Sequence, residues 1–149
     1  MKILFPNDLY RVFPVYGPLF FLAGPICGGD DWQRRCCEEI RGYIQHFYAA
    51  IPWRYREGYP LLRFRAVDIE NYFDRQTTWE RYYLNVAATD GCIIFWFPRE
   101  SKTNPRADDN PYAMDARAEL EEWRGRLMND HNLRVVIGAE PGFPGLSQI

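Results

Sequence analysis

A glycine-rich turn follows an apolar run in the stretch FFLAGPICGGDDW, residues 20–32. Gly24, Gly28 and Gly29 would let the backbone approach a ligand closely, and the N–H groups at the start of the following helix favour an anion. The turn is not a P-loop, because no Gly-Lys-Ser/Thr follows it, and it lacks the GxGxxG pattern of dinucleotide-binding proteins. Its sequence suits a binding loop for a polar ligand and, equally, a plain turn between a strand and a helix.

Carboxylates near the starts of two later helices are the second chemical feature. Glu80 lies in TTWERYY, and Glu119 lies in ARAELEEW. A carboxyl group with a raised pKa can donate a proton, and an ionised one can act as a nucleophile. Both glutamates also have ordinary structural roles. Glu80 would complement the helix dipole, and Glu119 would belong to a solvated helix face with Glu121 and Glu122, where Arg117 and Glu121 form an ion pair one turn apart.

The predicted secondary structure brings these features to one edge of a sheet. Apolar runs predict strands at 19–23, 61–67, 91–97 and 133–138, and helical spacing predicts helices at 31–50, 77–90 and 113–128. Strands that alternate with helices predict one α/β domain over residues 1–149, an open parallel sheet of four to five strands with helices on both faces, as in flavodoxin and Rossmann-like folds. Residues 1–18 would be an N-terminal extension or an edge strand. Ligands bind such sheets at the carboxyl ends of the strands.

Aromatic side chains and a long polar segment lie near the same predicted edge. Trp32, Trp96 and Phe97 could stack on a planar base, or they could belong to the core. Residues 98–112, PRESKTNPRADDNPY, form a connection of a length that is uncommon in compact domains. Such segments are often binding loops or lids.

The composition excludes several classes of function. With 149 residues and a net charge of −2, the chain lacks the basic excess of proteins that bind nucleic acids. The longest apolar run, GPLFFLAGPI, is too short to cross a bilayer, and MKILFPNDLYRVF does not form a signal peptide. Four cysteines without a CxxC and two histidines without ligand spacing predict no metal site. We therefore expect a cytoplasmic protein with reduced cysteines that binds a small molecule, and neither a nucleic acid nor a membrane.

Four segments together resemble the nucleoside 2-deoxyribosyltransferase family, particularly its branch of nucleoside 2-deoxyribosyltransferase-like proteins. They are FFLAGPICGGDDWQ, TTWERYYLNVAATDGCIIFWFP, ARAELEEW and RVVIG, in the family's order and at compatible spacing over about residues 19–138. The opening AGPICGG is also similar to the corresponding loop of the 2'-deoxynucleoside 5'-monophosphate N-glycosidases, which share the fold. One departure is Glu121, where the family usually has glycine two residues after the catalytic glutamate.

The resemblance implies a chemistry and a set of site residues. Glu119 would attack the anomeric C1' of the deoxyribosyl group, and Glu80 would give a proton to the departing base. Gly24 and Pro25 would shape the nucleoside pocket, and no metal or organic cofactor would be required. The other residues expected to bind substrate are Ile26, Gly28, Gly29, Asp31, Trp32, Trp96, Phe97, Pro98 and Arg117.

Several functions remain open on the sequence. The first is an enzyme that transfers the deoxyribosyl group of a 2'-deoxynucleoside to a second free nucleobase, as a homo-oligomer. A hydrolase of deoxynucleoside monophosphates is an alternative, with the glycine turn and Arg99, Lys102 or Arg106 meeting the phosphate. The same pocket could also be a catalytically idle nucleotide-binding sensor, or the aromatic-rich surface could serve assembly.

Overall fold

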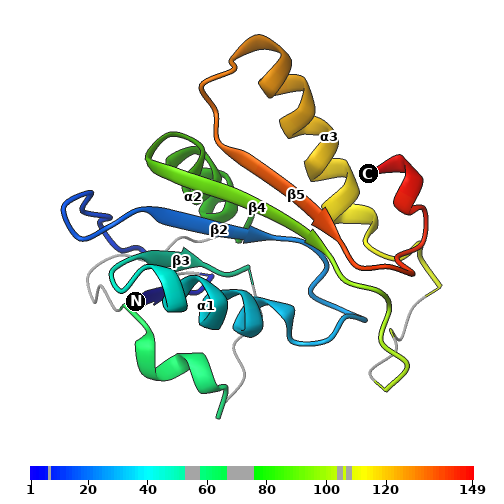
Figure 1. The fold of residues 1–149 in the computed structure, drawn as a ribbon, viewed down its shortest axis with the longest axis horizontal. Helices are drawn as coiled ribbons and strands as arrows, with labels where there is room; N and C mark the ends of the chain where they lie inside the picture. Colours follow the sequence, from blue (N-terminus) through cyan, green and yellow to red (C-terminus); the bar gives the residue numbers. More distant parts are fainter. Residues whose placement is uncertain (7, 53–57, 67–75, 104–105, 107–108) are drawn as a thin grey trace.

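An open, all-parallel sheet organises the chain in the computed structural model, which describes residues 1–6, 8–52, 58–66, 76–103, 106 and 109–149. Within these residues the sheet has five strands in the order β1-β3-β2-β4-β5 (Figure 1). They are β1 (Lys2–Leu4), β2 (Leu19–Ala23), β3 (Tyr48–Ala50), β4 (Gly91–Phe97) and β5 (Val135–Ala139). The α/β fold with a parallel sheet is therefore confirmed.

Helices cover both faces of this sheet, and each face has its own hydrophobic core. Helix α1 (Trp32–Tyr43) and the 3-10 helix η1 (Pro60–Phe64) pack against one face with Ile3, Leu22 and Ala49. Helices α2 (Gln76–Asp90) and α3 (Met114–Asn129) pack against the other face. A short 3-10 helix, η2 (Leu146–Gln148), follows β5.

The strongest sequence patterns gave the most accurate elements. The strands predicted at 19–23 and 91–97 have those bounds, and the helices predicted at 77–90 and 113–128 are each within one residue at their ends. In β4 the odd-numbered residues from Gly91 to Phe97 are buried and the others are half-buried. This alternation is what the period of two in a strand produces when helices cover one face more fully than the other.

The helix predicted at 31–50 is wrong in its second half. Helix α1 ends at Tyr43, and Tyr48–Ala50 form β3, which pairs with β1 on one side and with β2 on the other. All three β3 side chains are buried. Pairing on both edges and full burial outweigh the helical propensity of the two alanines, which is only a weak local preference.

In the segment predicted as a strand at 61–67, residues 61–64 belong to a 3-10 helix. Pro60 occupies the first turn of η1, where its fixed φ and missing N–H are tolerated. Only Arg65 makes a single parallel bridge, with Ile3, and Val67 lies outside the described residues. Within residues 1–18, β1 pairs with β3 at the edge of the sheet, which confirms the expectation of an edge strand.

The order of the strands places a crevice beside β2. From β2 the chain passes through α1 to β3 on one side, and it later passes through α2 to β4 on the other side. The connections diverge at this point, so a crevice opens between them at the carboxyl ends of the strands. This is where the glycine-rich turn leaves β2.

Gly91 offers a test of how tightly β2 and β4 are packed. A Cβ at Gly91 would lie 1.7 Å from the carbonyl oxygen of Leu19, its partner across the ladder. Gly91→Ala is therefore expected to lower the free energy of unfolding by about 2–4 kcal/mol in urea titrations, because backbone must move. Gly42→Ala is the control: nothing lies within 4 Å of its Cβ, and it is expected to stabilise α1 by about 0.5–1 kcal/mol. Equal effects of the two substitutions would contradict this packing.

Candidate functional site

A cavity of about 480 Å³ opens at the carboxyl edge of the sheet. The turn after β2 forms one wall through Gly24–Cys27, and the first turns of α2 and α3 form the opposite walls. Arg106, Asn110, Pro111 and Ala113 of the segment between β4 and α3 also line it, as do Phe21 of β2 and Pro52 after β3. The cavity therefore lies where ligands bind in open α/β sheets.

Glu80 from α2 and Glu119 from α3 both line this cavity. Burial raises the pKa of Glu119 to about 7, and the negative charges of Glu80 and then Glu122 add to that shift. Burial also raises the pKa of Glu80, as does the charge of Asp115 to a lesser extent. A hydrogen bond of 2.7 Å from Gln76 Nε2 to Glu80 Oε1 acts in the opposite direction, because it favours the ionised form. Near pH 7 the Glu119 carboxyl is therefore about half protonated.

A second hollow, of about 240 Å³, lies between α2 and α3. Glu80 and Glu119 line it as well as the first cavity, so the two carboxylates lie at the boundary between the hollows. The second hollow is also lined by Trp123 and Arg126, whose guanidinium lies 4.6 Å from the centre of the Trp123 ring. Both carboxylates are therefore accessible from either hollow.

The glycines of the turn after β2 have different neighbours. Gly24 lines the cavity, but it has a φ of +150°, and a Cβ there would lie 2.2 Å from the carbonyl oxygen of Trp96. Sheet packing alone therefore requires a glycine at this position. A Cβ on Gly28 would contact the Arg106 side chain, and a Cβ on Gly29 would contact the Tyr112 hydroxyl and Pro98. Side chains of the protein itself cover these two glycines, whereas Pro25 and Ile26 line the cavity.

The described part of segment 98–112 packs on this turn. The backbone N–H of Ser101 donates a 2.6 Å hydrogen bond to the carbonyl oxygen of Gly28. Arg106 pairs with Glu100, at 2.9 Å from Nε to Oε1, and its guanidinium lies 5.5 Å from the centre of the Tyr112 ring. Among the described residues that line the cavity, Arg106 is the one lysine or arginine, and neither Arg99 nor Lys102 is among them.

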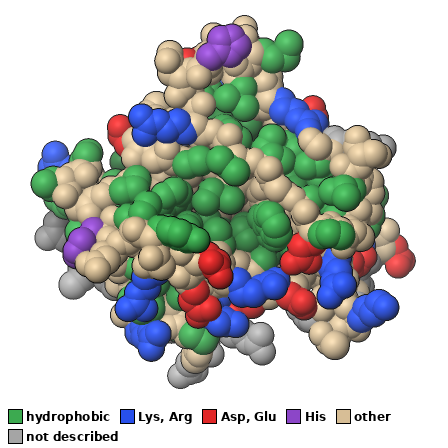
Figure 2. Space-filling model, viewed as in Figure 1, with side chains coloured by type: hydrophobic (Ala, Val, Ile, Leu, Met, Phe, Trp, Pro, Cys, Tyr) green, Lys and Arg blue, Asp and Glu red, His purple; other side chains and the backbone are tan. Residues whose placement is uncertain are grey.

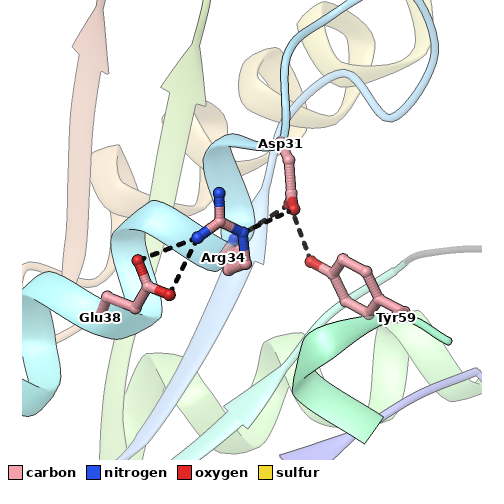
Figure 3. Close-up of polar contacts among 4 residues, drawn as sticks. All are labelled: Asp31, Arg34, Glu38 and Tyr59. Carbon is pink, nitrogen blue, oxygen red and sulfur yellow. Dashed lines mark hydrogen bonds and ion pairs between the residues drawn. The ribbon is translucent and has the colours of Figure 1, made fainter.

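Asp31 and Trp32 hold the beginning of α1 in place. Asp31 is the N-cap of α1: its Oδ1 accepts hydrogen bonds from the Arg34 N–H and from the Tyr59 hydroxyl, and Arg34 also pairs with Glu38 (Figure 3). Trp32 is buried, and its Nε1 donates a 3.0 Å hydrogen bond to the carbonyl oxygen of Pro25. These contacts position the turn, and neither residue is among the described residues that line the cavity.

Four further predicted residues also lie outside the described lining. Trp96 packs on the α1 side of the sheet across Gly138, and Phe97 is buried on the other side against Phe143. Arg117 donates to the carbonyl oxygen of Pro144 and stacks on Phe143, and Pro98 contacts Gly29. Of the predicted site residues, the structure therefore brings Gly24, Pro25, Ile26, Glu80 and Glu119 together at the cavity. The others are not among the described residues that line it.

Sequence reasoning missed several residues of the cavity, among them Cys27, Gln76, Asn110 and Asp115. A usable signal existed for two of them. Gln76 lies one turn before Glu80 and Asp115 lies one turn before Glu119, so each shares a helix face with a candidate glutamate. Residues one turn from a predicted catalytic group on the same helix should be added to its site.

The burial of Glu119 predicts a pH-dependent cost to stability. Its carboxyl ionises near 4.5 in the unfolded chain and near 7 in the folded protein, so stability is lost as the pH rises between these values. Glu119→Gln is therefore expected to raise the free energy of unfolding by about 3 kcal/mol more at about pH 8 than at about pH 4.5. Urea titrations at the two pH values measure this difference. The control Glu121→Gln changes an exposed neighbour, and an equal pH-dependent gain in that variant would contradict the burial of Glu119.

The described residues contain no group of three or more side chains arranged to hold a metal ion. In the same part of the chain, no helix has the length and apolar character needed to cross a membrane. Comparison with models of known protein families and with curated protein sequences gives no match for this chain.

Proposed function

We propose that the protein cleaves the N-glycosidic bond of 2'-deoxynucleosides and transfers the deoxyribosyl group to a second nucleobase. The observation that carries this proposal is the pair of half-buried carboxyl groups, Glu80 and Glu119, in one cavity at the carboxyl edge of the sheet. Two carboxyl groups that share a site and both have raised pKa values suit a reaction that needs one acid and one ionised carboxylate. The family resemblance supports the assignment of the nucleophile to Glu119.

In this proposal Glu119 attacks C1' while the bond from C1' to the base breaks. The electron pair of that bond leaves with the base, which takes a proton from Glu80, and the sugar remains on Glu119 as an ester. A second base then attacks C1' and displaces Glu119, and Glu80 accepts the proton that this base loses. Two displacements at C1' retain its configuration.

A proton has to be on Glu80 when the bond from C1' to the base breaks. The pKa of Glu119 is about 7, so this half-buried group competes for the proton. As the bond breaks, the positive charge that develops on the sugar ring favours the ionised form of Glu119. The proton is therefore expected on Glu80. The hydrogen bond from Gln76 would be weakened when Glu80 is protonated on Oε1, so the proton is readily given up to the base.

A mixture of one deoxynucleoside and a different free base tests the proposal. Chromatography of the products should reveal the new deoxynucleoside. Free base alone would indicate a hydrolase, and neither product, together with stabilisation by the nucleoside in thermal unfolding, would indicate a binding protein. Either result contradicts transfer.

Arg106 favours a second candidate, the hydrolysis of deoxynucleoside monophosphates. It is the one cation in the described lining, and it lies beside the glycine turn, where a 5'-phosphate could reach it. In that case activity requires the phosphate, and Arg106→Ala raises KM for the monophosphate, whereas Arg99→Ala outside the cavity does not.

A further inference from the structure

The second hollow, of about 240 Å³, is lined by residues of α2 and α3 alone in the described part of the chain. We refer to it as the α2–α3 hollow and to the first cavity as the sheet-edge cavity. Glu80 and Glu119 are the two described residues that line both spaces. The groups that would break and re-form the bond at C1' therefore lie between them. A substrate held at these carboxyl groups can place one part on each side.

The sizes of the two spaces suit the two halves of a nucleoside. Pockets for drug-sized ligands measure about 300–1,000 Å³, and the sheet-edge cavity, at about 480 Å³, falls within this range. The α2–α3 hollow is smaller than this range and suits a single ring system. The larger space therefore suits the deoxyribose with any group on its 5' carbon, and the smaller space suits the base.

Arg126 gives the α2–α3 hollow a planar cation that is held in place. Its Nη1 donates a 2.9 Å hydrogen bond to Asn85 Oδ1, its Nη2 pairs with Glu122 Oε1 at 2.6 Å, and its guanidinium lies 4.6 Å from the centre of the Trp123 ring. Among the described residues these hydrogen bonds use two of the five N–H groups of the guanidinium, which leaves donors for a ligand. Bases stack on aromatic rings and guanidinium planes and form hydrogen bonds through their edges. Arg126 therefore supplies both kinds of contact that hold a nucleobase.

The charges that line the α2–α3 hollow nearly cancel. Arg81 and Arg126 oppose Glu80, Glu119 and Glu122, and Glu119 is about half protonated near pH 7. A phosphate or another anion would be repelled by these carboxylates, whereas a base without net charge would not. The hollow therefore favours a neutral planar ligand.

The sheet-edge cavity offers a base little stacking surface over its described part. Phe21 is the one aromatic residue among its described lining, and its exposed fraction is 0%. Trp96 packs on the α1 side of the sheet, where Figure 2 shows hydrophobic side chains over the middle of the face. Glu80 and Glu119 belong to α2 and α3, which cover the opposite face. A stacking surface close to both carboxyl groups is therefore found in the α2–α3 hollow.

We propose that the α2–α3 hollow binds the nucleobase, so that one base leaves and the next enters between α2 and α3 while the sugar stays on Glu119 in the sheet-edge cavity. This inference rests on the proposed function, because it assigns a place to each half of that substrate. It agrees with retention at C1', since both bases must then approach the same face of the sugar. Glu80, which exchanges a proton with each base, lines the hollow.

Ala118→Leu tests the assignment, because Ala118 lines the α2–α3 hollow and is not among the described residues that line the sheet-edge cavity. The longer side chain should narrow the hollow, and a purine needs more room there than a pyrimidine. We expect kcat/KM for transfer between two purines to decrease at least about tenfold more than for transfer between two pyrimidines. Gly125→Leu is the control: it adds the same side chain to α3 at a position where nothing lies within 4 Å of the Cβ, and it should not separate the two classes of base.

Binding of a free base is measured separately from transfer, by NMR of the isotopically labelled full chain. Adenine and thymine should each shift the indole N–H signal of Trp123, which Trp123→Phe identifies. Ala118→Leu should raise the dissociation constant of adenine at least about tenfold, whereas Gly125→Leu should not.

The two measurements separate failure of this inference from failure of the proposed function. A protein in which free bases shift the Trp123 signal, but which forms no new deoxynucleoside, would support the base site and contradict transfer. Transfer by a protein whose Trp123 signal neither base shifts would overturn the base site and leave the proposed function standing. An equal loss of purine and pyrimidine transfer in Ala118→Leu would also overturn the base site.

Discussion

Glu119→Gln is expected to lower the rate of deoxyribosyl transfer at least about a thousandfold. The amide is close in shape to the carboxylate but cannot form the ester with C1', and the remaining binding groups cannot replace that bond. The rate is measured as formation of the new deoxynucleoside. Glu121→Gln is the matched control, because Glu121 is two residues away on α3 and is exposed, pairing with Arg124.

Trapping the intermediate identifies the nucleophile independently of rate. Wild-type protein that is denatured rapidly during turnover should carry one deoxyribosyl group on the peptide that contains Glu119, as detected by mass spectrometry. This group should be missing from the Glu119→Gln variant. A deoxyribosyl group on Glu80 would show that Glu80 is the nucleophile and not the acid. Full activity of Glu119→Gln would show that Glu119 takes no part in the reaction.

Glu80→Gln is expected to have the second largest effect, a loss of about a hundredfold or more in the rate of transfer between ordinary bases. The variant cannot protonate the departing base. A deoxynucleoside whose base leaves readily as an anion should therefore lose much less activity than a natural one. Glu38→Gln on α1, where Glu38 pairs with Arg34, is the control and should retain the wild-type rate.

Glu80→Gln should also change how the transfer rate and the pKa of Glu119 behave with pH. In the wild-type protein the rate should decrease as the pH rises beyond the raised pKa of Glu80, because Glu80 then lacks the proton that the departing base requires. Removing the charge of Glu80 removes one cause of the raised pKa of Glu119, so that pKa should decrease in Glu80→Gln. It should stay above the ordinary value of 4.5, since burial is the larger cause. Carboxyl carbon resonances followed by NMR give this pKa directly, and an unchanged value would show that the two groups do not interact.

The sequence alone determined the elements whose patterns are local. Residues 19–23 and 91–97 are uninterrupted apolar runs, and 77–90 and 113–128 repeat apolar residues at helical spacing. In these segments burial and backbone preference agree, so the pattern is sufficient. The parallel sheet then followed from the alternation of strands and helices, and its carboxyl edge indicated where the site should be.

Tertiary structure decided the elements that depend on distant partners. Tyr48–Ala50 became β3 because two strands flank it, and no nearby residue signals that pairing. Likewise, Gly28 and Gly29 are covered by Arg106 and Tyr112, which come from the far end of the chain. Gly28 and Arg106 are about 80 residues apart in the sequence, and local propensity carries no information on a contact between residues that distant.

The candidate site was likewise determined partly by the sequence and partly by the tertiary structure. The sequence supplied Glu80, Glu119 and the turn at Gly24 as candidates, each with an ordinary structural alternative. Only the packing of α2 and α3 on the same face of the sheet placed both carboxyl groups in one cavity, and their partial burial there is the largest cause that raises the pKa of Glu119 to about 7. Residue type sets which chemistry is available to a side chain, whereas desolvation and neighbouring charge, which set its proton affinity, arise when the chain folds.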